Sequence, residues 1–225
     1  MQTTLSSGIY TIPDAARILG LSLPKVRRWL KGSETFDTTE ESPARYGIDN
    51  YGIKGVGLEK HMDFLSLIEI YTVMRLRELK VSFPTIRRAR ADLAERLGVN
   101  HPFAAQSLFV DGAKLLTEND NLHYELGTNG QIAIRMVLEP FLLRVDFETS
   151  TRMAERLHPL GRERKVIVDP RRAFGRPVVD GTAITTEALA SLYKGGESIE
   201  DLAQQFDLKE VAIHDALEFE HCLAA

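Results

Sequence analysis

Two short helical segments joined at a glycine, near the start of the chain, constrain the fold more than any other feature of the sequence. In the first segment, three apolar residues recur at the spacing of one helix face: Ile12, Ala16 and Leu19. Thr11 and Asp14 lie three residues apart, as the partners of a capping box do where a helix begins. Gly20 then supplies a tight turn. The pattern predicts a short helix, a turn and a second helix.

The second segment, "LSLPKVRRWLKG" (21–32), is apolar along one stripe and basic elsewhere. Ser22 can cap it, and Pro24 is tolerated in a first turn because its missing amide hydrogen would have no helical partner. The apolar arc comprises Val26, Trp29 and Leu30. The remaining circumference carries Lys25, Arg27, Arg28 and Lys31. We therefore predict a helix from about residue 23 with one buried and one positive side.

Two helices joined in this way are typical of a helix-turn-helix, whose second helix enters the DNA major groove. Residues 1–31 carry five basic residues against one acidic residue, a net charge of +4 in a chain whose net charge is −4. A local positive excess favours phosphate binding, because each neutralised phosphate releases counterions. The alternative is a helical hairpin with a solvated basic face. We favour DNA binding through the four basic residues of the second helix.

Composition limits the class of protein. A chain of 225 residues, 44% of them hydrophobic, can bury one sizeable core or two to three small ones. Its one cysteine, Cys222, excludes an internal disulfide framework. No segment is apolar over the length of a membrane span, and the N-terminus lacks the apolar core of a signal peptide. We expect several small units and a cytoplasmic location.

Residues 32–60 predict a flexible connection. "GSETFDTTEESPARYG" is rich in small and acidic residues, as loops are, and "IDNYGIKGVGLEKH" is a candidate hairpin or wing following the helix-turn-helix. The glycines of the second stretch do not form a phosphate-binding loop, because no Gly-Lys-Ser/Thr follows them.

Two longer helices are predicted next. The segment from Met62 to Leu79 is apolar on most faces, which predicts a central buried helix, and its part around Leu67 and Tyr71 is one candidate dimer interface. Ser82 can cap the following helix, which Gly98 ends. The buried face of that helix is predicted to comprise Ile86, Ala89, Leu93 and Leu97.

Three arginines cluster in the first half of the helix after Ser82: Arg87, Arg88 and Arg90. They could reach DNA phosphates beside the first basic helix, or they could form an ordinary solvated face. We treat Arg87 and Arg88 as further candidate DNA-binding residues.

Residues 101–147 differ from the helical segments before them. The stretches "SLFVDGAKLL" and "GQIAIRMVL" predict short strands of a small connecting sheet. This sheet is a second candidate dimer interface.

The C-terminal third resembles a known family. Its opening string comprises Asp169-Pro170, "FGRPVV" (174–179) and Gly181-Thr182, with Ile184 following. This string resembles the start of the domain-of-unknown-function family 433, whose members continue into a small helical module. Three helices are predicted here: one from about Thr185 to Gly195-Gly196, one capped by Ser198 with Asp201 at the box position, and one from about Leu208.

Proteins that combine this module with an N-terminal helix-turn-helix resemble VapB-type antitoxins, the partners of PIN-domain ribonuclease toxins. The resemblance implies two functions: neutralising a toxin and repressing the shared promoter. The N-terminal half also resembles the MerR-type winged helix-turn-helix, including the helical pair around Pro84.

The C-terminal helices are acidic. From residue 186 onward, nine acidic residues stand against two lysines, a net charge of −7. The last helix is predicted to expose Glu210, Asp215, Glu218 and Glu220. Such a face repels phosphates, so we expect the last helix to contact protein and not to recognise DNA. On the same helix, Ile213 and Leu217 either meet another chain or enlarge the local core.

A basic segment precedes these helices. Its arginines are the candidate toxin-binding residues: Arg162, Arg164, Arg171, Arg172 and Arg176. The resemblance implies a toxin that holds Mg²⁺ with carboxylates, and an arginine can bind such carboxylates through bidentate hydrogen bonds. Alternatively, the last three arginines pair with Asp169, Asp180 or the acidic helices and hold the module together.

No pattern indicates an enzyme. The six histidines are scattered without metal-ligand spacing, and no nucleophile elbow is present. We therefore predict a mainly α, homodimeric regulator without cofactor or metal, divided into 1–100 (helix-turn-helix), 101–147 (small β connector) and 148–225 (helical module). The leading hypothesis is an antitoxin that binds a PIN-domain toxin and its operator. The alternatives are a MerR-like, ligand-responsive transcription regulator without a toxin partner and a scaffold that does not bind DNA.

Overall fold

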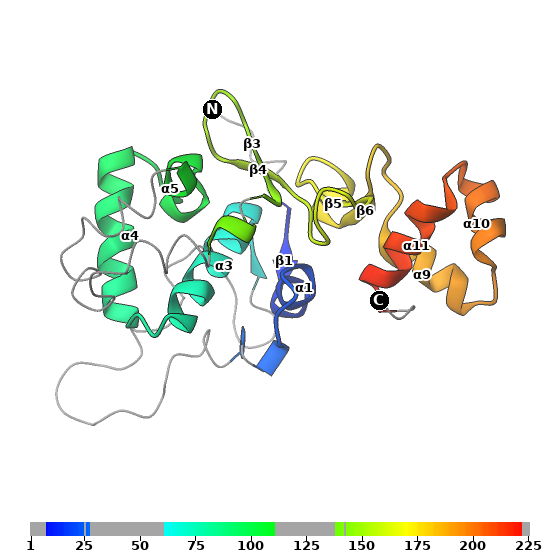
Figure 1. Ribbon diagram of the computed structural model, residues 1–225, viewed down its shortest axis with the longest axis horizontal. Helices are drawn as coiled ribbons and strands as arrows, with labels where there is room; N and C mark the ends of the chain where they lie inside the picture. The colour runs from blue at the N-terminus through cyan, green and yellow to red at the C-terminus, as the bar shows by residue number, and fades with distance from the viewer. Residues whose placement is uncertain (1–7, 25, 28–60, 111–137, 142, 222–225) are drawn as a thin grey trace. The chain divides into compact units, whose positions relative to one another are not determined.

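The computed structural model describes residues 8–24, 26–27, 61–110, 138–141 and 143–221. Within these ranges the chain is mainly α-helical, with two small β-sheets (Figure 1). This agrees with the predicted mainly α class.

The chain divides into two compact units. The N-terminal unit comprises Ile9–Leu142 and Phe147–Ala154, and the C-terminal unit contains Leu143–Asp146 and Glu155–Ala225. Each unit has its own buried core, in line with the expectation of several small units. The predicted three-part division of the chain stays a prediction.

The N-terminal unit starts with strand β1 (Tyr10–Thr11) and helix α1 (Ile12–Ile18). The predicted capping box is present. The Thr11 hydroxyl accepts a hydrogen bond from the Asp14 backbone N–H at 3.3 Å, and the Thr11 N–H donates to Asp14 Oδ2 at 3.0 Å. Ile12, Ala16 and Leu19 are buried, which confirms the predicted apolar face.

A turn separates α1 from a second helical stretch. Gly20 has a φ of 63°, in the left-handed region that favours glycine. The backbone is helical again at Leu23, Pro24, Val26 and Arg27. The Val26 N–H donates to the Ser22 carbonyl at 3.0 Å, as expected at the start of a helix capped by Ser22. Val26 is buried and Arg27 is exposed, as predicted.

Strand β1 pairs antiparallel with β2 (His61–Met62), placing Tyr10 opposite Met62. This pairing was not predicted, because its two strands are separated by about fifty residues. His61 is the last residue of the stretch predicted as a wing. The rest of that stretch and the predicted loop before it lie outside the described residues.

Helix α3 (Phe64–Glu78) is the predicted central buried helix. Asp63 caps it by accepting the Ser66 N–H at 2.8 Å. Leu67 and Tyr71, predicted as a dimer interface, are buried within the single chain, where the Tyr71 ring stacks on Phe141 with centroids 3.5 Å apart. This part of α3 therefore belongs to the core of its own unit.

Helix α4 (Phe83–Leu97) has the two predicted caps. Ser82 accepts the Thr85 N–H at 3.3 Å, and Gly98, with a φ of 64°, ends the helix in the left-handed conformation. The predicted apolar face is buried at Ile86, Ala89 and Leu93 and half-buried at Leu97.

The strand predicted over residues 107–116 is wrong in its first part. The chain there forms a 3₁₀ turn, η4 (Pro102–Ala104), followed by helix α5 (Gln106–Val110), in which Leu108 is buried. Periodicity alone does not separate a buried strand from a buried helix over so short an apolar run. The rest of that prediction lies outside the described residues, and Leu138, the end of the second predicted strand, is helical.

The C-terminal unit contains most of a four-stranded sheet in the order β3-β4-β5-β6. The strands are β3 (Val145–Phe147), β4 (Ala154–Leu157), β5 (Val166–Val168) and β6 (Pro177–Val179). Strands β5 and β6 are antiparallel, with Ile167 opposite Val178. Both strands are wholly buried, and neither was predicted.

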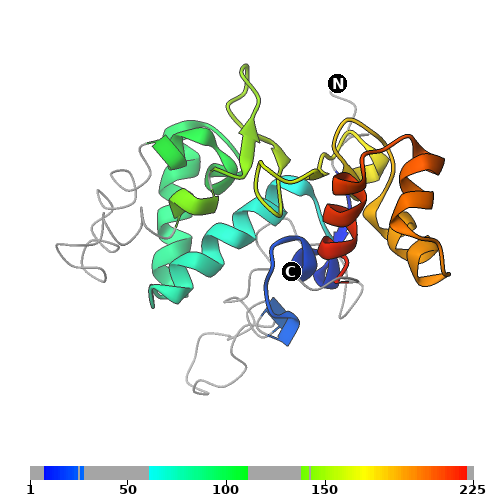
Figure 2. The ribbon, with the colours of Figure 1, turned by 45° about the vertical axis from the view of Figure 1, so that its right-hand side comes forward.

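Three helices complete this unit: α9 (Thr186–Lys194), α10 (Ile199–Phe206) and α11 (Glu210–Phe219). Ser198 caps α10 as predicted, and α9 starts at the predicted place, with Thr185 as its cap. Helix α11 starts two residues after the predicted Leu208. The helices pack together (Figure 2) around a shared apolar core that includes Leu189, Leu202, Ile213 and Leu217. Of the two alternatives for Ile213 and Leu217, the structure therefore supports the one in which they enlarge the local core.

No helix in the described part of the chain is both long enough and apolar enough to cross a membrane.

Candidate functional site

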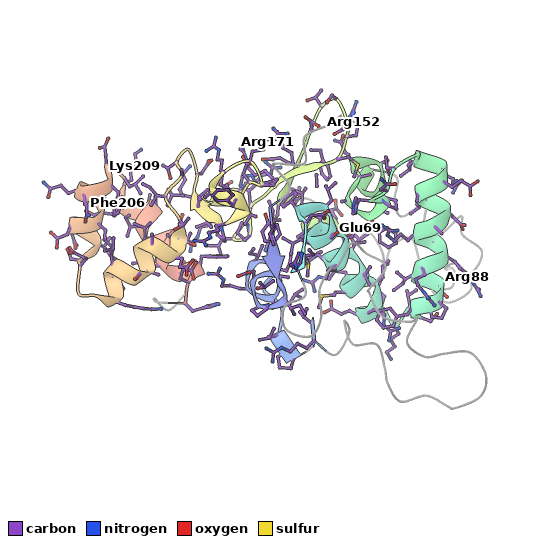
Figure 3. The ribbon with its side chains drawn as sticks, turned by 180° about the vertical axis from the view of Figure 1, so that it is seen from behind. Glu69, Arg88, Arg152, Arg171, Phe206 and Lys209 are labelled. Atoms are coloured by element: carbon purple, nitrogen blue, oxygen red, sulfur yellow. The ribbon has the colours of Figure 1, made fainter. Side chains whose placement is uncertain are left out.

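The candidate DNA-binding residues that the structure describes lie on two helical stretches of the N-terminal unit. Arg27 is exposed on the stretch that follows the turn at Gly20. Arg88 is exposed on α4, on the side that faces away from α3 (Figure 3), and Arg87 is half-buried. The remaining candidates, Lys25, Arg28 and Lys31, lie outside the described residues, as do Trp29 and Leu30. Their role in DNA binding stays a prediction.

Arg90 has a structural role instead. Its Nη2 lies 2.9 Å from Oε2 of Glu69, a fully buried carboxylate on α3 (Figure 3), and His101 Nδ1 lies 3.0 Å from the same oxygen. The Phe103 N–H donates to Glu69 Oε1 at 3.1 Å. A buried carboxylate needs partners of this kind to offset its lost hydration. The network joins α3, α4 and η4, and its signal in the sequence was an acid in the middle of an apolar helix, away from both ends.

Arg162 is held by the first strand of the four-stranded sheet. Its guanidinium donates to the Leu143 carbonyl at 2.6 Å and to the Val145 carbonyl at 3.1 Å, and lies 2.6 Å from Asp146 Oδ1. His158 Nε2 is 2.9 Å from the other oxygen of Asp146. Burial pushes the pKa of Asp146 upward, but hydrogen bonds from His158 and Arg162 outweigh it and hold that pKa below its ordinary value.

Arg164 joins the loop after β4 to α11. Its Nε lies 3.1 Å from Oδ1 of Asp215, and its Nη2 contacts Glu218. The predicted exposure of Asp215 is wrong, because its side chain is buried against this arginine and accepts the Lys165 N–H at 2.8 Å. Glu218 and Glu220 are half-buried, so Glu210 is the one residue of the four predicted acids that is exposed.

The other three candidate arginines lie on the loop between β5 and β6, where Figure 3 labels Arg171. Arg171 Nη1 is 2.5 Å from Glu155 Oε1, and Arg172 Nε is 3.5 Å from Asp169 Oδ2. Arg176 makes one long pair with Glu187, at 3.9 Å, and its side chain is 67% exposed. Pairing within the module therefore exists for all three, and a role in binding a partner stays a prediction.

Sequence reasoning did not single out Phe174 as a functional residue. It lies on the same loop between Arg172 and Arg176 and is 88% exposed. The signal in the sequence was an aromatic residue between arginines in a stretch without helical or strand periodicity.

His214, Asp215 and Glu218 offer ligand atoms within 4.8 Å of one another, a spacing that could hold a cation. The guanidinium of Arg164 already contacts both carboxylates. This group is therefore explained by an ion pair.

Residues 166–219 match the family described as "Protein of unknown function (DUF433)". The match spans β5, β6, the loop between these two strands and the three helices, and confirms the family resemblance of that segment. A curated relative from Mycobacterium tuberculosis (strain ATCC 25618 / H37Rv), named "Putative antitoxin VapB45", is 22% identical over 222 residues. The alignment covers 93% of this chain and 92% of that protein. This chain is similar to a VapB-type antitoxin.

A solved structure agrees with the fold. The crystal structure of Rv2018 from Mycobacterium tuberculosis superposes with a TM-score of 0.69 at 20% identity and covers 92% of this chain and 96% of that chain. At this identity the likeness establishes a shared fold across both units. The MerR-like character of the N-terminal half stays a prediction.

Proposed function

We propose that this chain is the antitoxin of a type II toxin–antitoxin pair, which binds and neutralises a PIN-domain ribonuclease toxin. The observation that carries the proposal is the similarity to a protein named as an antitoxin over 93% of the chain. Similarity of this extent includes both units, and not only the segment matched by the family. On this proposal the chain has no catalytic activity and acts in the cytoplasm, where a ribonuclease meets its RNA.

Toxin binding is assigned to the C-terminal unit. Arg171 and Arg176 both have more than half of the side chain exposed, although each also contacts a carboxylate of the unit. Exposed guanidinium groups can bind the carboxylates of a toxin active site through charge-assisted hydrogen bonds. Arg162 and Arg164 contribute less on this proposal, because strand carbonyls and α11 already hold them.

Autorepression is assigned to the N-terminal unit, acting as a homodimer. Three features support this assignment, because a helix-turn-helix would contain each of them. They are the capped α1, the left-handed turn at Gly20 and the helical stretch with exposed Arg27. A two-fold dimer on an inverted repeat would double the DNA that one such motif covers.

The test uses the full-length chain and the PIN-domain protein encoded by the adjacent gene. RNA cleavage by that protein is measured alone and with an equimolar amount of this chain. We expect cleavage to be suppressed by the wild-type chain and restored in part by Arg176→Glu, which reverses an exposed charge. The matched control is Lys194→Glu, which reverses an exposed charge on α9 and should still inhibit.

If the wild-type chain neither binds nor inhibits the adjacent protein, the antitoxin assignment fails. The MerR-like regulator that responds to a small ligand then becomes the better interpretation, with the same DNA-binding region.

A further inference from the structure

The loop between β5 and β6 holds an aromatic side chain out in solvent. Phe174 is 88% exposed, whereas Phe64, Phe103, Phe141 and Phe219 are buried in the cores of their units. An exposed phenylalanine forgoes the free energy that burial would supply. Aromatic side chains, phenylalanine included, are also enriched in protein interfaces relative to the rest of the surface. Phe174 is therefore a candidate contact residue.

The backbone keeps Phe174 in this position. Ala173, Phe174 and Gly175 have φ values of 44°, 58° and 83°, all in the left-handed region. Residues with a Cβ adopt this conformation only when the surrounding structure imposes it. The chain thus accepts a strained backbone at a bulky residue that gains no burial from it.

A buried carboxylate holds the loop in place. Asp169 accepts the Arg171 N–H at 2.9 Å, and Arg156 Nη2 and Arg172 Nε each lie 3.5 Å from its Oδ2. The Gly175 N–H also donates to the Arg172 carbonyl at 2.8 Å. With its ends fixed in this way, the loop presents Phe174 with little conformational entropy left to lose on binding.

The charge of the loop identifies the kind of partner. Residues 169–176 contain three arginines and one acid, and that acid is buried. An aromatic ring among arginines could bind a nucleic acid or an acidic protein surface. The residues from 186 onward carry a net charge of −7 in the same unit, which opposes a polyanion. A protein pocket with a few carboxylates at its rim avoids most of that repulsion.

We infer that Phe174 is the anchor residue of the antitoxin interface, inserting into an apolar pocket of the partner protein whose rim carboxylates bind Arg171 and Arg176. The inference rests on the proposed function and names the surface that performs it.

The experiment measures the affinity of the full-length chain for the PIN-domain protein of the adjacent gene by isothermal titration calorimetry. Phe174→Ala should weaken binding by about 30-fold or more, the effect of losing an interface anchor. Val211→Ala is the matched control, because Val211 is 55% exposed on α11 of the same unit. It should change the affinity less than about threefold, since most interface and surface residues contribute little. Circular dichroism of each variant should match the wild type.

A second variant reports burial directly. Phe174→Trp should keep the affinity within about tenfold, and its fluorescence should shift to shorter wavelength on complex formation. Wild-type protein, whose one tryptophan is Trp29, is the reference.

Wild-type binding with no loss in Phe174→Ala overturns this inference and leaves the proposed function standing. No binding by the wild-type chain overturns both. A loss of affinity for a single-stranded oligonucleotide in Phe174→Ala, with partner binding intact, would also overturn it in favour of nucleic-acid stacking.

Discussion

Arg164 forms an ion pair with Asp215, at 3.1 Å between Nε and Oδ1, although the two residues are about fifty positions apart in the sequence. The Asp215 side chain is 1% exposed, and its second oxygen accepts the Lys165 N–H at 2.8 Å. The pair fixes α11 against the loop that leads into β5. An acid that the helical pattern assigned to the surface is thereby part of the interior of the C-terminal unit.

Arg164→Ala should lower the free energy of unfolding by about 1–3 kcal/mol, because it leaves a buried carboxylate with the backbone N–H as its remaining partner. Urea denaturation measures the effect. The control is Arg176→Ala, which removes an exposed pair at 3.9 Å and should cost less than about 0.5 kcal/mol. Equal costs for the two variants would contradict the structural role of Arg164.

Glu69→Gln should lower the free energy of unfolding by about 2–3 kcal/mol, since the buried network with Arg90 and His101 loses its negative charge. The same denaturation experiment on Glu95→Gln, an exposed acid of α4, serves as the comparison and should change stability by less than about 0.5 kcal/mol. If the network did not stabilise the fold, the two variants would have the same midpoint of urea denaturation.

The lowered pKa of Asp146 predicts that the protein loses stability in acid. Its pKa in the folded state lies below the ordinary value of 3.8, so it contributes stability that is present above about pH 4 and is lost as the pH falls through the folded pKa. Asp146→Asn should therefore be less stable than the wild type near pH 6, and the gap should narrow below about pH 4. Denaturation of both proteins across this range measures it, and a gap that stays constant with pH would argue against the ion pair.

Phe174→Gly should raise the free energy of unfolding by about 0.5–1 kcal/mol, because glycine adopts a φ of 58° without strain. Phe174→Ala is the control: it also removes the ring but keeps the Cβ, and should leave thermal stability close to that of the wild type. A lower melting temperature for the glycine variant would mean that the ring supports the fold.

Arg27→Ala should weaken binding to the DNA upstream of the gene and reduce the salt slope of the affinity by about one unit if Arg27 contacts a phosphate. Fluorescence anisotropy at several salt concentrations measures this, with Arg96→Ala, an exposed arginine in the last turn of α4, as the control. Unchanged affinity after replacing both Arg27 and Arg28 would remove this helix from DNA recognition.

The sequence alone was sufficient to predict the features that depend on residues close together in the chain. The ends of the helices could be predicted because a cap joins groups within one helical turn. These predictions were the capping box of Thr11 with Asp14, the caps at Ser82 and Ser198, and the end of α4 at Gly98. The buried character of α3 followed from apolar residues on most of its faces.

Only the tertiary structure decided which distant groups meet. The pairing of Tyr10 with Met62, the network around Glu69 and the burial of Asp215 all join segments separated by twenty or more residues. The loop that exposes Phe174 also depends on a contact outside itself, because Asp169 at its start is held by Arg156 of β4. Periodicity assigns a residue to a face of its own helix or strand, whereas the charge and burial of that face depend on what the fold packs against it.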